Sequence, residues 1–223
     1  MSFKATNLPR KIAFWINNVY GYCIHRFFMA TSILKAPSIQ AGPSGRAVAE
    51  QMNSELLSAF QHHLNMERQA HTVYYAAALW CAERELRGFT QFFRKESLSE
   101  LQHSAKFADF LIARGQTVEL HDLPAPNQQW TMPVDLMETS FQMEVDVTTS
   151  LQQLYAFAER SSDTRTTVFL DPMIEKQTQS EHEFAHLLGR VRFADNQASA
   201  LLLIDNELEQ GKFQPVSLQT NAI

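Results

Sequence analysis

Glu100-Leu101-Gln102-His103 places an acid and a histidine three residues apart within a stretch rich in aromatic and aliphatic side chains. Residues three apart lie on adjacent turns of one helix face, so both side chains can reach the same metal ion. A helix with so many apolar neighbours must bury a face, and a buried carboxylate needs a partner that neutralises it. The stretch predicts a pair of metal ligands inside a helical core. The alternative is a surface Glu and His that share a face by chance.

The composition favours a helical protein with a sizeable core. The 223 residues are 45% hydrophobic with few Gly and Pro residues, and Leu, Ala, Gln and Glu are plentiful. Cys23 and Cys81 are too few for a disulfide framework and indicate a reducing compartment, so we expect a cytoplasmic protein. No apolar run approaches the ~20 residues that a membrane-spanning helix needs, so no membrane partner is expected.

Charge is divided unevenly along the chain. The first 49 residues carry six Lys or Arg and no acid, whereas the remainder carries 13 basic and all 24 acidic residues. An acidic body argues against nucleic-acid binding and suits the attraction of cations.

Residues 1–48 form a basic N-terminal extension for which three interpretations are open. The stretch from Ile12 to Met29 is interrupted by two asparagines and makes a poor secretory signal. Its lack of acids resembles an organelle-targeting segment, and the third interpretation, which we favour, is a mis-assigned start with translation beginning at Met29. Residues 36–45 contain Pro and Gly breakers and are expected to be a flexible lead-in.

Helical periodicity and end signals predict five helices. Four are long and one is short, and they cover residues 53–83, 88–114, 133–160, 164–193 and 196–210. Pro172 falls inside the fourth, so that helix either kinks there or begins there. We therefore expect a bundle over 49–195, a short fifth helix at 196–211 and a loose tail at 212–223.

The segment 116–131 reads as a long crossover. A helix of about 27 residues is ~40 Å long, and some 16 extended residues reach ~53 Å. The segment can travel the length of a bundle, which predicts an all-α four-helix bundle with one long crossover and a short fifth helix.

The long helices offer polar side chains at inward positions: Glu67, Glu100 with His103, Glu144 and Gln177. Such bundles build carboxylate-bridged di-iron sites at one level of the core. Carboxylate oxygens and imidazole suit iron(II). Without metal the three glutamates would repel, and at least one would tend to stay protonated. His63 and His71 flank Glu67 at four residues on either side, and we interpret them as solvated histidines rather than a second metal set.

Residues 54–211 resemble ferritin, specifically the bacterial non-haem ferritins. Residues 81–92 and 162–172 look most like cyanobacterial members. The successive steps along the chain from Glu67 to Glu100, then to His103, Glu144 and Gln177, are 33, 3, 41 and 33 residues. The family pattern can be aligned with these steps without a gap.

The resemblance implies a role for each of these residues. Glu67, Glu100 and His103 match the ligands of a first iron, with Glu100 bridging to a second. Glu144 matches the main ligand of the second iron, with Gln177 near it. Tyr74 matches the tyrosine beside the centre, which in the family supplies an electron or a hydrogen bond. The alternative for Tyr74 is a core tyrosine whose hydroxyl is satisfied.

The chain departs from the family pattern at several positions. A third iron site is not expected, because its acids are replaced by Ser99, Lys176, Gln179 and Ser180. Glu96 and Glu175 are spare carboxylates that we interpret as an uptake or transit site for iron, with solvated surface residues as the alternative. A haem-binding bacterioferritin is disfavoured because its haem methionine would fall at Leu101, so no haem is expected.

The function implied is that of an iron-storage ferritin with ferroxidase activity. Iron(II) and dioxygen would react at two irons per subunit, and ferric mineral would collect inside a homo-oligomeric cage of 24 subunits. The helix at 196–210 would line the four-fold axes, and Asp163 and Asp171 are candidate acids at the three-fold axes.

Two other functions remain open on the same sequence. One is a di-iron or dimanganese oxidase that acts on an organic substrate on the same bundle. Another is a helical interaction protein with a degenerate centre. A mini-ferritin that protects DNA fits less well, because its chain is shorter.

Overall fold

The computed structural model describes residues 39–215. The chain divides into two units, Met1–Gln40 and Ala41–Ile223, and the arrangement that follows is that of the second unit. Residues 1–38 of the predicted N-terminal extension and residues 216–223 of the predicted tail lie outside the described residues.

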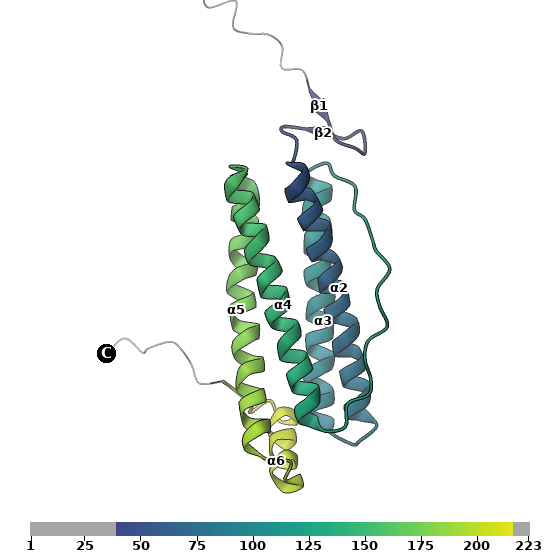
Figure 1. The fold of residues 1–223 in the computed structure, drawn as a ribbon, viewed down its shortest axis with the longest axis vertical. Helices are drawn as coiled ribbons and strands as arrows, with labels where there is room; N and C mark the ends of the chain where they lie inside the picture. Colours follow the sequence, from purple (N-terminus) through teal and green to yellow (C-terminus); the bar gives the residue numbers. More distant parts are fainter. Residues whose placement is uncertain (1–38, 216–223) are drawn as a thin grey trace, which may run out of the picture. The chain divides into compact units, whose positions relative to one another are not determined.

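The described part of the second unit, residues 41–215, contains five helices, as predicted. Their bounds are α2 (Ser54–Ala82), α3 (Arg87–Ala113), α4 (Pro133–Arg160), α5 (Thr164–Phe193) and α6 (Ala198–Glu209), shown in Figure 1. The two-residue strands β1 (Gln40–Ala41) and β2 (Ala47–Val48) were not predicted, and β1 lies within the expected flexible lead-in at 36–45. None of the helices between residues 39 and 215 combines the length and hydropathy that a transmembrane segment needs.

Local sequence signals set the helix ends. The side chain of Asn53 accepts hydrogen bonds from the backbone amides of Glu55 and Leu56 at the start of α2. Gly115 follows α3 with a φ of 73°, a conformation that glycine adopts without strain. Helix α5 begins at Thr164 and continues through Pro172, which lies on its exposed face. Of the two alternatives at Pro172, a helix that begins there is therefore wrong, because α5 starts eight residues earlier.

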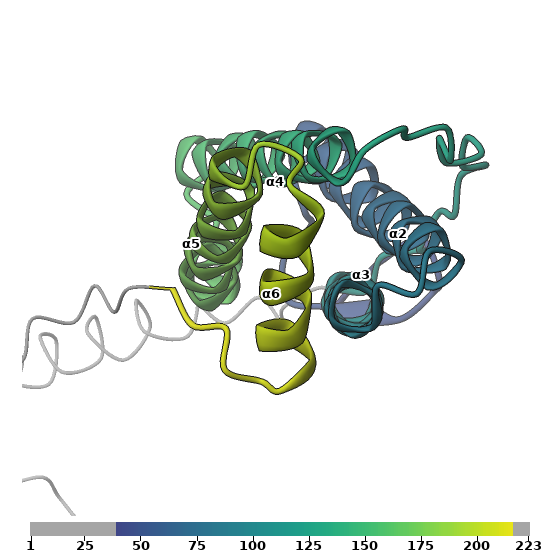
Figure 2. The ribbon, with the colours of Figure 1, turned by 90° about the horizontal axis from the view of Figure 1, so that it is seen from below.

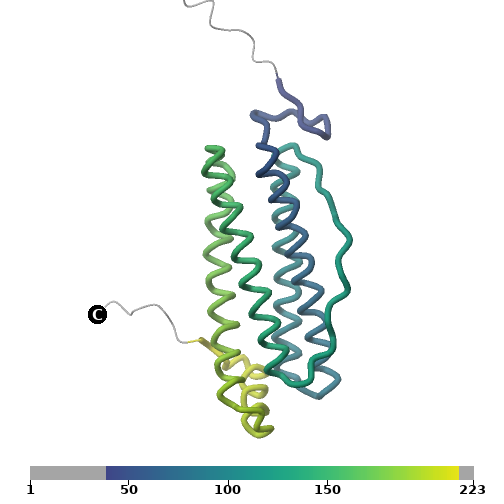
Figure 3. The backbone as a smooth tube through the Cα atoms, in the orientation of Figure 1, coloured from purple at the N-terminus to yellow at the C-terminus, as the bar shows by residue number. Residues whose placement is uncertain are grey.

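The four long helices pack as two antiparallel pairs joined by the predicted crossover. Helix α2 packs against α3 and α4, and α4 packs against α5. Figure 3 shows the connection after α3 running along the outside of α2 to reach α4. Amide side chains of α2 hydrogen-bond to the backbone of this connection, which forms neither helix nor strand and so cannot pair its own amides and carbonyls regularly. Gln61 donates to the Thr117 carbonyl at 2.6 Å, and Asn65 donates to the Glu119 carbonyl at 2.9 Å.

Helix α6 crosses one end of the bundle between α5 and α3, as seen from below in Figure 2. A Cβ on Gly88 would lie 1.8 Å from the carbonyl oxygen of Asp205, so only glycine permits this close approach. The buried Asp205 carboxylate accepts from the Phe89 amide at 2.9 Å. This bond satisfies an amide at the start of α3, where Leu86 provides no side-chain cap.

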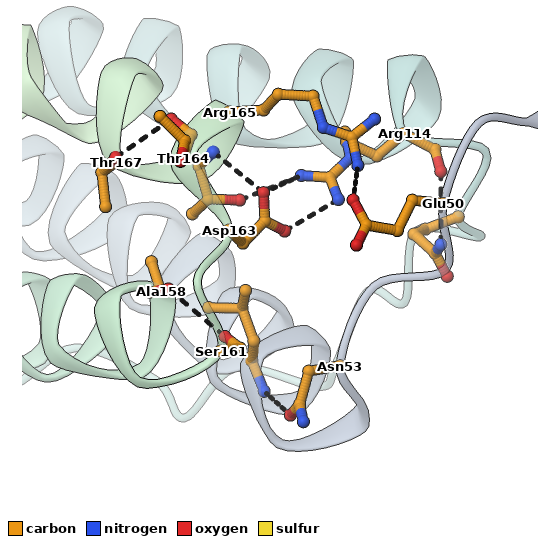
Figure 4. Close-up of polar contacts among 12 residues, drawn as sticks. Glu50, Asn53, Arg114, Ala158, Ser161, Asp163, Thr164, Arg165 and Thr167 are labelled. Atoms are coloured by element: carbon orange, nitrogen blue, oxygen red, sulfur yellow. Dashed lines mark hydrogen bonds and ion pairs between the residues drawn. The ribbon is translucent and has the colours of Figure 1, made fainter.

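At the other end of the bundle a buried ion pair ties α3 to α5. Arg114 donates to both oxygens of Asp163, at 3.0 and 2.8 Å, and to the Thr166 hydroxyl at 3.0 Å (Figure 4). Beside it Arg165 binds Glu50 at 2.8 Å. Asp163 also caps α5 through the Thr166 amide. Its carboxylate is therefore neutralised by Arg114, which disfavours the interpretation of Asp163 as an acid at a cation channel.

Candidate metal centre

A layer of polar side chains crosses the interior of the bundle and separates its core into two apolar clusters. Two separate apolar clusters contain, on one side, Tyr74, Phe93 and Phe184 and, on the other, Leu64 and Phe107. Between the clusters, on four different helices, lie the buried residues Glu67, Glu100, His103, Glu144 and Gln177. All five predicted ligand positions thus lie at one level of the bundle interior.

Glu67, Glu100 and His103 form one compact donor set. A ligand atom from each lies within 4.8 Å of the other two. The Nδ1 atom of His103 is 3.0 Å from Oε2 of Glu100 and 3.7 Å from Oε2 of Glu67. The Oε2 atom of Glu67 is buried and has no hydrogen-bond partner. Two carboxylates and an imidazole converging in this way suit a divalent transition-metal ion.

Glu144 is held by two donors on neighbouring helices. The Tyr74 hydroxyl donates to its Oε1 atom, and Gln177 Nε2 donates to its Oε2 atom at 2.8 Å. Tyr74 is fully buried and stacks on Phe184 with ring centroids 5.2 Å apart. Tyr74 is thus a core tyrosine whose hydroxyl has a hydrogen-bond partner, as the alternative had it. That partner is the predicted ligand Glu144, so Tyr74 also lies beside the candidate centre.

The two spare carboxylates lie in different surroundings. Glu96 is only 3% exposed, its Oε1 atom lacks a hydrogen bond, and Lys95 Nζ approaches that atom at 3.2 Å. The negative charge of Glu96 raises the pKa of Tyr74 and of Glu144, so Glu96 lies close enough to the polar layer to influence it. Glu175 is exposed on α5. The alternative of a solvated surface residue thus fails for Glu96 and fits Glu175.

The prediction that His63 is solvated is wrong. His63 is 0% exposed, with Nδ1 2.9 Å from the Ser150 hydroxyl and Nε2 3.0 Å from Oε1 of Glu67. His71 is half-buried, with Nδ1 2.8 Å from the Ser97 carbonyl. His63 could have been found from its spacing, because it falls on the line of buried α2 positions that runs through Phe60, Glu67 and Tyr74. No sequence signal pointed to Ser150.

Without a cation, protons compensate the charges of the donor set. Burial opposes ionisation of Glu67, but the neighbouring imidazoles of His103 and His63 outweigh it and hold its pKa below the usual range. Burial and the charge of Glu67 raise the pKa of Glu100 to about 9. Burial disfavours protonated His103, but its hydrogen bonds with both glutamates raise its pKa to about 9. The mutual repulsion of glutamates predicted from sequence is thus relieved by protonation.

Glu144 and Tyr74 also have shifted pKa values. Burial raises the pKa of Glu144 to about 7, and the hydrogen bonds from Tyr74 and Gln177 limit that rise. Burial and the nearby carboxylates raise the pKa of Tyr74 well above its usual value. The phenol therefore keeps its proton and acts as a hydrogen-bond donor.

Comparisons with known proteins agree with this fold. Residues 57–194 match the ferritin-like domain. The chain is 25% identical over 162 residues to a bacterial non-haem ferritin of Staphylococcus haemolyticus, covering 73% of this chain and 98% of the relative. It is 27% identical over 158 residues to that of Staphylococcus aureus, covering 70% and 95%. An open pore ferritin of Archaeoglobus fulgidus superposes with a TM-score of 0.69 at 26% identity, covering 72% of this chain and 98% of that one. With the predicted helix order, crossover and polar layer all present, this chain belongs to the ferritin family and is of the bacterial non-haem kind.

Proposed function

We propose that this protein stores iron and that each subunit oxidises Fe(II) with dioxygen at paired sites in the polar layer. The observation that carries the proposal is the buried set of Glu67, Glu100 and His103, with Glu144 beside it on a third helix. A structural core would gain nothing from clustering these groups, since buried carboxylates without cations are costly.

The residues divide the work. Glu67 and His103 would hold one Fe(II) and Glu144 a second, with Glu100 bridging between them. Two Fe(II) ions each lose one electron, and the two electrons with two protons reduce one dioxygen to hydrogen peroxide. Gln177 and Tyr74 fix the carboxylate of Glu144 from two sides, with the Tyr74 phenol kept protonated as a hydrogen-bond donor at the reaction centre.

Glu96 is proposed as the transit site through which iron reaches the layer. It is buried and its charge acts on Glu144 and Tyr74, and its Oε1 atom has no hydrogen bond, with the Lys95 ammonium 3.2 Å away. Glu175, exposed on α5, would act earlier on the route, where ions are still hydrated. Ser99, Lys176, Gln179 and Ser180 offer no acids for a third iron site, and no haem is proposed.

The ferric product would accumulate as a mineral inside a cage of 24 subunits in the cytoplasm. Helix α6 would line the four-fold axes of that cage. Phe193, Leu202 and Leu203 at and near this helix are exposed in the single chain, as apolar residues of a subunit contact are. The family match disfavours an oxidase that acts on an organic substrate.

The deciding experiment is anaerobic Fe(II) loading of the apoprotein, sized by gel filtration, followed by an oxygen pulse. A cage-sized particle should oxidise about two irons per subunit in a fast phase and then continue to mineralise. Glu100→Ala should abolish the fast phase, whereas Asp109→Asn, an exposed acid on the same helix, should leave it intact. A wild-type protein without a fast phase would refute the oxidation chemistry. A small oligomer would refute the cage.

A further inference from the structure

We propose that His63, held by Ser150, is a positioning residue that fixes Glu67 so that its Oε2 atom is the one presented to the metal. This inference rests on the proposed metal site and adds two residues to it. Neither His63 nor Ser150 is a proposed ligand. Ser150 lies on α4, whose own proposed ligand, Glu144, would hold the second metal ion rather than the first.

The ring of His63 is clamped on three sides. The Ser150 hydroxyl of α4 lies 2.9 Å from Nδ1, and Oε1 of Glu67, one turn along α2, lies 3.0 Å from Nε2. Phe107 of α3 packs edge-on against the ring with centroids 4.5 Å apart. The ring has no exposed surface, so it is fixed by packing rather than by solvent.

The partner on Nε2 selects the tautomer. A neutral imidazole carries its proton on one nitrogen, and the group facing each nitrogen decides which one. A serine hydroxyl can donate or accept, whereas an ionised Glu67 carboxylate can only accept, so the ring proton stands on Nε2 and faces Oε1, and Nδ1 is left to accept from the Ser150 hydroxyl. The Nε2 atom lies 3.0 Å from Oε1 of Glu67 and makes no hydrogen bond to any other group.

The two oxygens of Glu67 are thereby given different roles. Oε1 is held by His63, whereas Oε2 is buried, lacks a hydrogen-bond partner and lies 3.7 Å from His103 Nδ1. Oε2 is therefore the oxygen aimed at the shared site. Groups that orient a ligand in this way contribute substantially to affinity, and their removal typically weakens metal binding by about 10- to 100-fold.

Co(II) titration of the assembled apoprotein under nitrogen tests the inference without any turnover. The d–d absorbance of Co(II) reports both affinity and ligand geometry. Four variants separate the roles of His63 and Ser150: His63→Leu fills the space without a donor, His63→Gln supplies a side-chain N–H, Ser150→Ala removes the hydroxyl that contacts Nδ1, and Ser150→Thr keeps a hydroxyl there. Gel filtration and far-UV circular dichroism confirm that each variant is assembled.

We expect His63→Leu to weaken first-site Co(II) binding by about tenfold or more, and His63→Gln to restore it to within a few-fold. Ser150→Ala should weaken binding by several-fold and Ser150→Thr should not. A His63→Leu protein that binds as well as wild type would overturn the inference, as would a His63→Gln protein as weak as the Leu variant, which would make His63 a ligand rather than a positioning donor. If the Leu variant does not assemble, unchanged binding in Ser150→Ala overturns it. Wild-type protein that binds no Co(II) would instead refute the proposed site itself.

Discussion

The hydroxyl of Tyr74 controls how readily Glu144 gives up its proton. Burial raises the pKa of Glu144 to about 7, and the hydrogen bonds from Tyr74 and Gln177 keep it from rising further. Tyr74→Phe removes one of these two donors and leaves the buried ring in place. We therefore expect the pKa of Glu144 to rise in the variant, with protons competing better against a cation for the second site.

The size of the effect follows from the geometry. A hydrogen bond to a charged group contributes roughly 1.5–3 kcal/mol, and each pKa unit corresponds to about 1.4 kcal/mol. The pKa of Glu144 should thus rise from about 7 by roughly one to two units. At pH 7 the ionised fraction would fall from about half to about a tenth or less, weakening second-site binding about five- to fifty-fold. Near pH 9 wild type and variant should converge to within a few-fold.

Anaerobic Co(II) titrations at pH 6, 7, 8 and 9 measure this directly. Tyr75→Phe is the matched control, because Tyr75 is the next residue on α2 and its side chain is exposed. Stoichiometry should fall from two ions towards one in Tyr74→Phe at low pH and recover as the pH rises. A defect of equal size at every pH would show that the phenol acts through packing or ligation, and the reasoning from the Glu144 proton would be refuted.

Three further predictions follow from the same contacts. Asp163→Asn keeps the cap of α5 but removes the partner of Arg114, whose pair with Asp163 is only 6% and 9% exposed; we expect a loss of ~2–3 kcal/mol at pH 7 by thermal melting. Burial opposes ionisation of Asp163, but Arg114 outweighs burial and holds the pKa of Asp163 below its usual value. The stabilisation is therefore present above the unfolded pKa of ~3.9 and is lost as the pH falls through the folded pKa. A stability difference between wild type and variant that persists at pH 2 would contradict this assignment. Gly88→Ala should displace α6, seen as faster amide hydrogen exchange over residues 198–209, whereas Gly189→Ala, whose Cβ would meet nothing within 4 Å, should not. Glu96→Gln should slow Fe(II) oxidation several-fold at limiting iron without changing the number of irons bound, and an unchanged rate would remove Glu96 from the route.

Most of the fold was predictable because its signals are local. Asn53 caps α2, Gly115 ends α3 and Pro133 begins α4, and each acts through its own backbone conformation or hydrogen bonds. The hairpin near Gly42 was missed because it depends on a tertiary approach. A Cβ on Gly42 would lie 2.1 Å from the carbonyl oxygen of Gly115, a contact between residues 73 positions apart in the chain.

The site was predictable in its ligands and less so in its surroundings. Helical phase separates the two spare acids: Glu96 is one turn before Glu100 and shares its face, whereas Glu175 is two residues before Gln177, about 200° around α5. The same phase places His63 on the face of Glu67. What phase cannot supply is the partner on another helix. Ser150 meets His63 across 87 positions of sequence, and only the packing of α4 on α2 brings them together.

The polar layer explains how a bundle tolerates acids that divide its core. Near pH 7 Glu67 is ionised, His103 carries a proton, Glu100 is neutral and Glu144 is about half ionised. The layer thus approaches neutrality with protons alone, which spares it the cost of several unpaired buried charges. Divalent cations bind the deprotonated ligands, so each arriving ion must displace protons from Glu100, His103 and Glu144. The stability of the empty bundle and its affinity for metal are therefore set by the same few protons, and the donors that hold Glu67 and Glu144 shift the balance towards the cation.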